Sequence, residues 1–163
     1  QMTHSETLPD LFSQLNQSLY QVLEKRTFVC FAMGEIEVES RKLRIANGGC
    51  PYPYLYRAAM GTIEEMNLDA FPLGLRSNAE YSVLELTVAE GDRVVLCSDG
   101  IIESSNVRGE LFGFERTSDT IRLGCDQGLG PEELIDFVYE RVETHRGSIE
   151  QEDDQTMVVL QLT

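Results

Sequence analysis

Three aspartates beside strand-like segments could do chemistry together. Asp99 comes two residues after the apolar segment 94–97, and Asp153 and Asp154 come just before the apolar segment 156–162. If these segments pair as antiparallel neighbours, the end of one lies beside the start of the other, with backbones about 5 Å apart. The sequence therefore predicts that Asp99 and Asp153 lie at the same edge of a sheet.

Carboxylates that converge in this way need a positive partner. Two like charges about 4 Å apart repel by about 4 kcal/mol at an effective dielectric of 20. A proton, a basic side chain or a cation could offset this repulsion, and Mg²⁺ or Mn²⁺ is the simplest choice because oxygen ligands and retained water suit both ions. Taken separately, Asp99-Gly100 is typical of a turn, and Asp153-Asp154 is typical of a solvated loop. Only their convergence favours a metal site.

Other reactive patterns in the sequence are weak. His4 and His145 are far apart, have no partners at a useful spacing, and are expected at the surface. No Gly-x-Ser-x-Gly elbow and no Cys-x-x-Cys pair occur. We interpret Cys50 as a structural loop residue because no base is near it, and Cys30 and Cys97 as small buried hydrophobic residues. Scattered cysteines in a chain of this size indicate a reducing compartment, so we expect a cytoplasmic protein.

The charge balance excludes whole classes of partner. The 163 residues include 13 basic and 28 acidic side chains, which gives a net charge of −15 at pH 7. Such a chain repels nucleic-acid phosphates and anionic membranes. Its longest apolar run, residues 28–33, is far shorter than the roughly 20 residues of a membrane-spanning helix. We therefore expect neither nucleic-acid binding nor membrane insertion.

The periodicity of apolar residues predicts both helices and strands. Apolar side chains three and four apart predict a helix over residues 8–25, capped by Thr7, and Pro131 predicts the start of a helix that runs to residue 145. A weaker helix is expected over residues 115–124 and a short helical turn over 101–105. Strands are expected at residues 28–33, 36–38, 43–46, 54–56, 81–88, 94–97 and 156–162. Paired glycines and a proline predict that residues 47–51 form a loop, and residues 58–80 are expected to be loosely structured.

This order of elements predicts the fold class. Strands grouped as hairpins, with helices before, between and after them, favour an α+β fold with mostly antiparallel sheets. With 42% hydrophobic and 25% charged residues, the composition is that of a globular protein. We expect residues 1–163 to form a single domain. There is no βαβ alternation and no Gly-x-Gly-x-x-Gly or P-loop motif that would bind a nucleotide.

Several motifs resemble, in the same order, those of the metal-dependent Ser/Thr protein phosphatases of the 2C type (PPM), in their bacterial SpoIIE/RsbU-like branch. The resemblance is carried by Asp99-Gly100 after one strand and by Asp153-Asp154-Gln155-Thr156 before another. Further similar stretches occupy residues 15–20, 28–29, 46–53, 72–75 and 111–116. The resemblance covers essentially the whole chain.

This resemblance implies a fold, a site and partners. The fold would be the C-terminal portion of an α-β-β-α sandwich with a two-metal centre. The metal ligands for Mg²⁺ or Mn²⁺ would be Asp99, Asp153 and Asp154, and the residues that support the motifs would be Gly100, Asn47 and Gly49. In such phosphatases the metals activate a water that attacks the phosphorus of phosphoserine or phosphothreonine, so no enzyme nucleophile is needed. The implied partners are a phosphorylated protein, such as an anti-sigma-factor antagonist, and an upstream sensor domain.

The sequence also departs from that pattern. The family's Asp-x-x-Gly-His-Gly motif, whose carboxylate bridges the two metals, is absent, and positions 50 and 48 hold Cys and Gly where His and Ala are usual. We therefore interpret the chain as the C-terminal part of a phosphatase domain. The parent protein is expected to be active, and the isolated chain to bind metal weakly and have low or no activity.

Other interpretations stay open. The chain could be a non-catalytic, phosphatase-like module for protein interaction, which the missing motif favours. A phosphatase of the haloacid-dehalogenase type is disfavoured because Asp99 lacks the second Asp of an Asp-x-Asp signature. A homodimer, in which a second copy covers exposed sheet edges, is also open.

Overall fold

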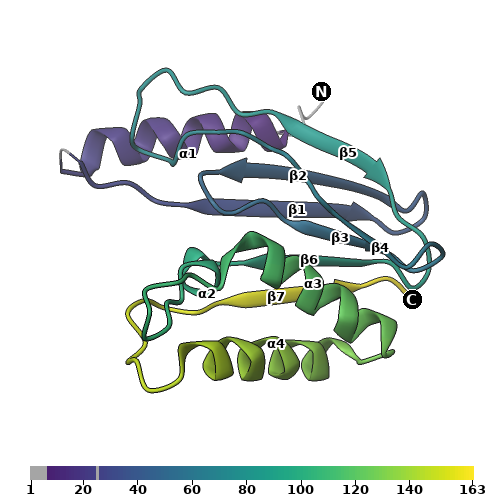
Figure 1. Ribbon diagram of the computed structural model, residues 1–163. Coiled ribbons are helices and arrows are strands. Elements are labelled where there is room, and N and C mark those ends of the chain that lie inside the picture. The colour runs from purple at the N-terminus through teal and green to yellow at the C-terminus, as the bar shows by residue number, and fades with distance from the viewer. Residues whose placement is uncertain (1–6, 25) are drawn as a thin grey trace. The chain divides into compact units, whose positions relative to one another are not determined.

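The computed structural model describes residues 7–24 and 26–163, and the chain divides into two compact units (Figure 1). Unit 1 comprises Gln1–Cys50 and Asn67–Val88, and unit 2 comprises Pro51–Met66 and Ala89–Thr163. His4 and Lys25 lie outside the described residues, and the helix predicted over residues 8–25 ends earlier than predicted, at Val22.

Unit 1 packs a helix, α1 (Leu8–Val22), against an antiparallel sheet. The sheet has the order β1-β2-β5, with β1 (Phe31–Glu37), β2 (Lys42–Gly48) and β5 (Val83–Thr87). The predicted cap of α1 is confirmed, because the Thr7 hydroxyl accepts a hydrogen bond from the Asp10 amide and the Asp10 carboxylate accepts one from the Thr7 amide. One buried cluster of this unit contains Leu8, Phe12, Ala46, Leu73 and Tyr81.

The apolar run that opens the first predicted strand lies at the margin of this sheet. The predicted strands 28–33 and 36–38 form one continuous strand that begins only at Phe31, while Val29 makes a separate antiparallel bridge with Leu73. Cys30 is exposed, so the prediction that it is a buried hydrophobic residue is wrong. Since β1 is an edge strand, apolar residues at its start are not enclosed on both sides, and Phe28 is 48% exposed.

Unit 2 contains an antiparallel sheet covered on one face by helices. Its strand order is β4-β3-β6-β7, with β3 (Tyr54–Arg57), β4 (Thr62–Glu65), β6 (Arg93–Cys97) and β7 (Met157–Gln161). The helices α3 (Gly113–Asp126) and α4 (Pro131–Arg146) lie along this sheet, and a short helix α2 (Asp99–Ile102) follows β6 (Figure 1). The core between sheet and helices includes Tyr54, Val95, Cys97, Ile121 and Leu134. The prediction that Cys97 is buried is confirmed.

The fold class predicted from the sequence is found in the structure, whereas one strand of the structure was not predicted. Helices with antiparallel sheets are found as predicted. The region 58–80 contains the strand β4, which was not predicted. Ile63 is the only apolar residue in β4, and this edge strand is mostly exposed, so its sequence carries almost no hydrophobic pattern.

A buried carboxylate fixes the start of β6. Asp92 is only 2% exposed, and its carboxylate accepts hydrogen bonds from the amides of Ala58 and Ala89, each at 3.0 Å. The guanidinium of Arg57 donates a third, also at 3.0 Å. Because a buried carboxylate is tolerated only when it is paired and hydrogen-bonded, these contacts join the β3–β4 hairpin to the strand that leads into Asp99.

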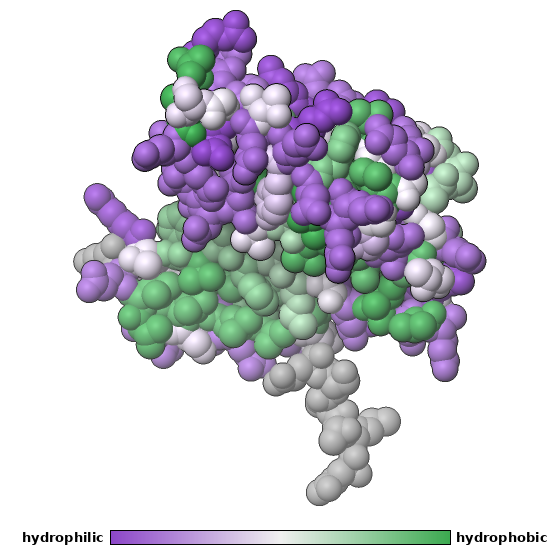
Figure 2. Space-filling view, turned by 90° about the horizontal axis from the view of Figure 1, so that it is seen from below, coloured by the Kyte–Doolittle hydropathy of each residue, from purple (hydrophilic) through white to green (hydrophobic). Residues whose placement is uncertain are grey.

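Apolar side chains also reach the surface, as the green areas in Figure 2 show. In unit 2, Val158 is 53% exposed and Leu160 is 37% exposed, and both belong to the edge strand β7. In unit 1, Phe31 on the edge strand β1 is 36% exposed. Within residues 7–24 and 26–163, no helix is long and apolar enough to cross a membrane.

Candidate metal centre

The two acidic segments meet because β6 and β7 are antiparallel neighbours. Their register pairs Cys97 with Met157, the last residue of one strand with the first of the other. The chain leaving β6 therefore runs beside the chain entering β7. The shared sheet edge predicted from the sequence was conditional on this pairing, and the structure confirms the pairing.

Ser98 holds the two segments together. Its amide donates a hydrogen bond to the Thr156 carbonyl, and its hydroxyl donates one to the Asp154 carbonyl, both at 2.9 Å. The same hydroxyl oxygen accepts a hydrogen bond from the Thr156 amide at 2.9 Å. Three hydrogen bonds from one residue therefore position the backbone on either side of Asp99 and Asp154.

Gly100 allows a closer approach than any other residue would. A Cβ atom at this position would lie 3.0 Å from the carbonyl carbon of Asp154 and closer still to its oxygen. The Gln155 side-chain amide also donates to the Gly100 carbonyl at 3.2 Å. The glycine is therefore required by packing between the two segments.

The carboxylates of Asp99 and Asp153 are exposed and accept few hydrogen bonds among the described residues. One oxygen of Asp99 accepts a hydrogen bond from the Gly100 amide at 3.1 Å, and one oxygen of Asp153 accepts from the Asp154 amide at 2.7 Å. Within the part of the chain that the structure describes, these are the hydrogen bonds that the two carboxylates make. Each keeps its second oxygen available to a ligand.

The donor chemistry at this edge fits part of a coordination sphere for a hard divalent cation. Mg²⁺ and Mn²⁺ prefer carboxylate and water oxygens, which Asp99 and Asp153 can provide. Among the described residues, however, no group of three or more His, Cys, Asp or Glu side chains is arranged to hold an ion. The edge provides an incomplete set of ligands.

Asn47 and Gly49, which the family resemblance singled out, organise a loop of unit 1. Asn47 is 2% exposed; its amide nitrogen donates to the carbonyls of Cys50 and Leu68, at 2.9 and 3.3 Å, and its oxygen accepts from the Cys50 amide at 3.0 Å. Gly49 has a φ of +87°, and an added Cβ would lie 2.9 Å from the Pro72 Cα. The predicted loop 47–51 therefore begins later than expected, because Asn47 and Gly48 still pair within β2 and the chain turns at Gly49.

A cavity beside the acidic edge contains residues that sequence reasoning missed. Its volume is about 80 Å³, and its lining includes Gly100 and Asp153 together with Ser104 and Arg146. Ser104 follows α2 and Arg146 ends α4, so 41 positions intervene between them and no short motif links them. The sequence offers one signal for Arg146, its position in the last turn of a helix. That position is typical of a cation that stabilises the helix end, and it does not indicate a cavity.

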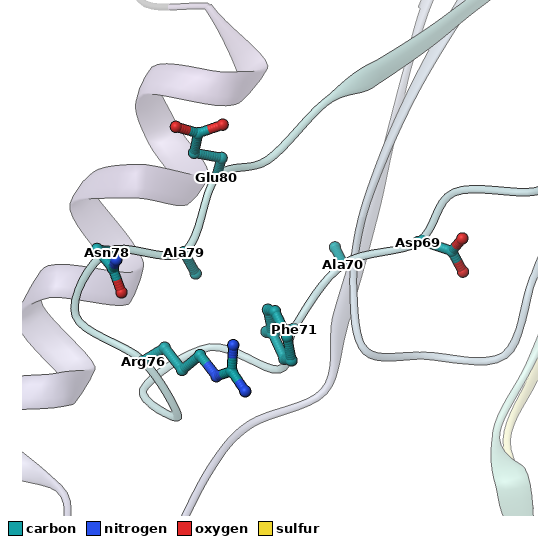
Figure 3. Close-up of a pocket in the computed structure, with 7 residues that line it drawn as sticks. All are labelled: Asp69, Ala70, Phe71, Arg76, Asn78, Ala79 and Glu80. Carbon is teal, nitrogen blue, oxygen red and sulfur yellow. The ribbon is translucent and has the colours of Figure 1, made fainter.

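A larger cavity of about 530 Å³ lies within the β4–β5 connection of unit 1 (Figure 3). There the guanidinium of Arg76 stacks on the ring of Phe71, with 3.8 Å between its central carbon and the ring centroid. Asp69 and Glu80 also line the cavity (Figure 3). None of the residues predicted for the metal site belongs to this described cavity.

His145, predicted to be at the surface, is half-buried and has a structural role. Its Nε2 atom lies 2.8 Å from the Glu110 carbonyl oxygen, and its ring packs edge-on against Phe112 with 5.5 Å between centroids. The imidazole joins the end of α4 to the segment before α3.

Comparison with known proteins gives a family and a fold. The model of the family described as Stage II sporulation protein E (SpoIIE) matches residues 1–163. A search of curated proteins found no significant match. Among solved structures, the SiaA-PP2C domain of Pseudomonas aeruginosa has 22% sequence identity and a TM-score of 0.82, with 98% of this chain and 62% of that chain covered.

Two further structures are similar. The PP2C phosphatase domain and a fragment of the regulatory domain of SpoIIE from Bacillus subtilis has 19% identity and a TM-score of 0.78, covering 96% of this chain and 44% of that one. RsbX in complex with magnesium has 16% identity and a TM-score of 0.65, covering 98% and 66%. The chain thus spans between 44% and 66% of the length of these structures. Because the family model matches the chain over its whole length, and because the fold is that of PP2C phosphatase domains, the chain belongs to the SpoIIE family.

Proposed function

We propose that the protein containing this chain is a Mg²⁺- or Mn²⁺-dependent phosphatase that hydrolyses phosphoserine or phosphothreonine on a regulatory protein, such as an anti-sigma-factor antagonist. The observation that carries this proposal is the hydrogen-bonded contact between residues 98–100 and 153–156, which brings two acidic segments to one sheet edge. Membership of the SpoIIE family and the magnesium bound by RsbX support the assignment.

The carboxylates have distinct parts in this proposal. Asp99 and Asp153 would hold the ions through the oxygens that their backbone neighbours leave available, and Asp154 would add a third carboxylate nearby. When bound, such ions lower the pKa of coordinated water and stabilise negative charge on the transferring phosphoryl group. Ser98 and Gly100 would act as positioning residues, because they hold the two acidic segments in register.

The chain by itself is expected to bind metal weakly and to have low or no activity. The described residues provide no group of three metal-ligating side chains, and the sequence lacks an Asp-x-x-Gly-His-Gly motif. Further carboxylate ligands would have to come from outside these residues. An upstream sensor domain in the parent protein and a cytoplasmic location fit this proposal.

The proposal is tested by hydrolysis of a phosphoserine protein by the full-length protein with and without Mn²⁺. The double variant Asp99→Asn, Asp153→Asn should lose at least about 100-fold in kcat/KM, because amides are poor ligands for hard cations while still accepting the backbone hydrogen bonds seen here. Asp136→Asn, an exposed carboxylate on α4, is the matched control and should keep full activity.

Metal binding can be followed without activity. Adding Mn²⁺ to the ¹⁵N-labelled chain should broaden the amide resonances of Gly100 and Asp154 selectively, because the unpaired electrons of the ion relax nearby nuclei. Undiminished hydrolysis by the double variant would refute the assigned roles of Asp99 and Asp153.

A second candidate function is a phosphatase-like module that binds a partner without hydrolysis. The incomplete ligand set among the described residues favours it. The two functions separate in one comparison: a module would bind the phosphorylated partner equally well with Mn²⁺ or with EDTA and would release no phosphate, whereas the phosphatase would release phosphate only with metal.

A further inference from the structure

The cavity beside the acidic edge contains two buried hydrogen-bonding groups with no partner. Ser104 is 9% exposed, and its hydroxyl makes no hydrogen bond among the described residues. The Nε atom of Arg146 is also buried and unpaired there, although its Nη1 atom donates to the Ile149 carbonyl at 2.9 Å. Both residues line the same cavity of about 80 Å³.

Such groups point to a ligand. A buried polar group without a hydrogen bond costs roughly 1–3 kcal/mol, so native proteins leave few of them. Two of them in the lining of one cavity indicate that the cavity is filled by something that accepts hydrogen bonds. Its volume is sufficient for a small polar side chain or several water molecules.

The charges around the cavity restrict what that ligand can be. Four carboxylates line it, from Glu103, Glu150, Glu152 and Asp153, and they would repel an anion. The guanidinium of Arg146 carries an N–H that a cation cannot satisfy. A purely apolar group would leave both the Arg146 and the Ser104 donors unpaired.

We infer that this cavity binds the side-chain amide of an Asn or Gln residue close to the phosphorylated residue of the protein substrate. An amide oxygen can accept from the Arg146 Nε–H and the Ser104 hydroxyl, while the amide NH₂ donates to the surrounding carboxylates. The group is neutral, so neither the carboxylates nor the guanidinium repels it. Its assignment to a substrate rests on the proposed function, because Gly100 and Asp153 belong to both the cavity and the acidic edge.

The first test needs no metal and no catalysis. The ¹⁵N-labelled chain is titrated with acetamide, with acetate and methylammonium as charged comparators, while the Arg146 Nε–H and Ser105 amide resonances are followed. Acetamide should give saturable shifts that the charged probes do not. Ser104→Ala should weaken acetamide binding about three- to ten-fold, the effect of one lost hydrogen bond.

Two matched variants keep this test interpretable. Ser104→Ala removes a hydroxyl that has no partner, so it should not lower the melting temperature. Arg146→Lys removes the Nε–H while keeping a positive charge at the end of α4, and Arg141→Lys on the same helix is its control. Equal shifts with all three probes would mean that the cavity does not select an amide, and no saturable shift with acetamide would mean that it holds only water; either result would overturn the inference.

The second test uses phosphoserine peptides and the full-length protein with Mn²⁺. Peptides with Gln or Asn at positions flanking the phosphoserine should show kcat/KM values about three- to ten-fold above those with Met or Leu, and Ser104→Ala should remove this preference. If no peptide is hydrolysed, the proposed phosphatase function fails while the acetamide titration still decides the inference. Hydrolysis with no preference for an amide would refute the link between this cavity and the substrate.

Discussion

Tyr54 is fully buried, and its hydroxyl makes no hydrogen bond among the described residues. Burial raises the pKa of this phenol well above its ordinary value, and nearby Cys97 and Glu65 add to the effect. The folded state thus keeps a proton that the unfolded chain releases above about pH 10. Stability from this group is fully present below that pH and is lost as the pH rises toward the folded-state pKa.

We expect Tyr54→Phe to raise the free energy of unfolding at pH 7 by about 1 kcal/mol, because it removes an unpaired buried hydroxyl. The variant should also lose less stability than the wild type above pH 10. Urea denaturation at pH 7, 9 and 10.5 measures both effects. Tyr139→Phe is the control: its hydroxyl donates to the Gln155 carbonyl at 3.1 Å, so the variant should be destabilised by about 1 kcal/mol. Equal losses in the two variants would contradict the prediction.

Gly100 is the residue through which the two acidic segments touch. Gly100→Ala should lower the free energy of unfolding by about 1–3 kcal/mol, because the new methyl group would overlap the Asp154 backbone. Gly130→Ala is the matched control, since its Cβ would meet nothing nearer than the Glu133 carboxylate at 3.5 Å. Thermal denaturation of both variants measures the difference, and a Gly100→Ala protein as stable as the control would argue against the close contact.

At the scale of elements, α1 positions the connection that precedes β5. Asn16 is 1% exposed; its side-chain nitrogen donates to the Arg76 carbonyl and its oxygen accepts from the Gly74 amide, both at 2.9 Å. A helix side chain therefore satisfies two backbone groups of an irregular segment. This contact also fixes the backbone of Arg76, whose guanidinium lines the cavity in Figure 3.

Asn16→Ala should cost about 2 kcal/mol of stability, because two buried backbone groups lose their partners. Hydrogen exchange of the Gly74 amide should become faster, because that amide loses its acceptor, whereas the higher helix propensity of Ala would not speed it. Gln17→Ala, at the next and exposed position of α1, should leave that exchange rate unchanged. An unaltered Gly74 rate in the Asn16 variant would refute this role.

The elements that could be predicted from the sequence are those whose apolar pattern is enforced by burial. The helix over residues 131–145 matches α4 because Leu134, Val138 and Val142 form one buried stripe. The strand β6 was predicted from a short apolar run with β-branched residues, most of which is buried, whereas β7 was predicted from a similar run although Val158 and Leu160 are exposed. The pairing of these two strands was a hypothesis, and once it is given, the antiparallel chain direction accounts for the meeting of the acidic segments.

What could not be predicted depends on long-range contacts. The sequence predicts Asn47 in a loop, yet Asn47 is buried in β2, because its side chain makes hydrogen bonds with three backbone groups. Ser104, which follows α2, and Arg146, at the end of α4, line one cavity although they are far apart in the sequence, and so no local pattern links them. The metal ligands, the single-domain organisation and any homodimer are still predictions.

At the scale of the whole molecule, the net charge of −15 sets the response to salt. Repulsion among surplus carboxylates opposes the compact state, and raising the ionic strength from about 0.01 to 0.15 M shortens the screening length from roughly 30 to 8 Å. We expect NaCl to raise the melting temperature at pH 7 by about 2–4 °C. Screening also weakens the exposed ion pairs, but these contribute little to stability.

This effect should shrink at pH 5, which is closer to the isoelectric point of about 4.4. Differential scanning calorimetry at both pH values, in low and moderate salt, measures it. A fall in melting temperature with salt at pH 7 would show that attractive ion pairs outweigh the repulsion.

Segments of the two units alternate along the sequence, since Pro51–Met66 of unit 2 precedes Asn67–Val88, the last segment of unit 1. During synthesis on the ribosome, β3 and β4 emerge well before β6, the strand that pairs with β3 on its other side. A two-stranded hairpin alone is marginally stable in water, so β3 and β4 have no stable sheet to join until residues 93–97 leave the exit tunnel. Translation speed between codons 66 and 97 therefore governs how long the nascent chain is open to chaperones and to proteolysis.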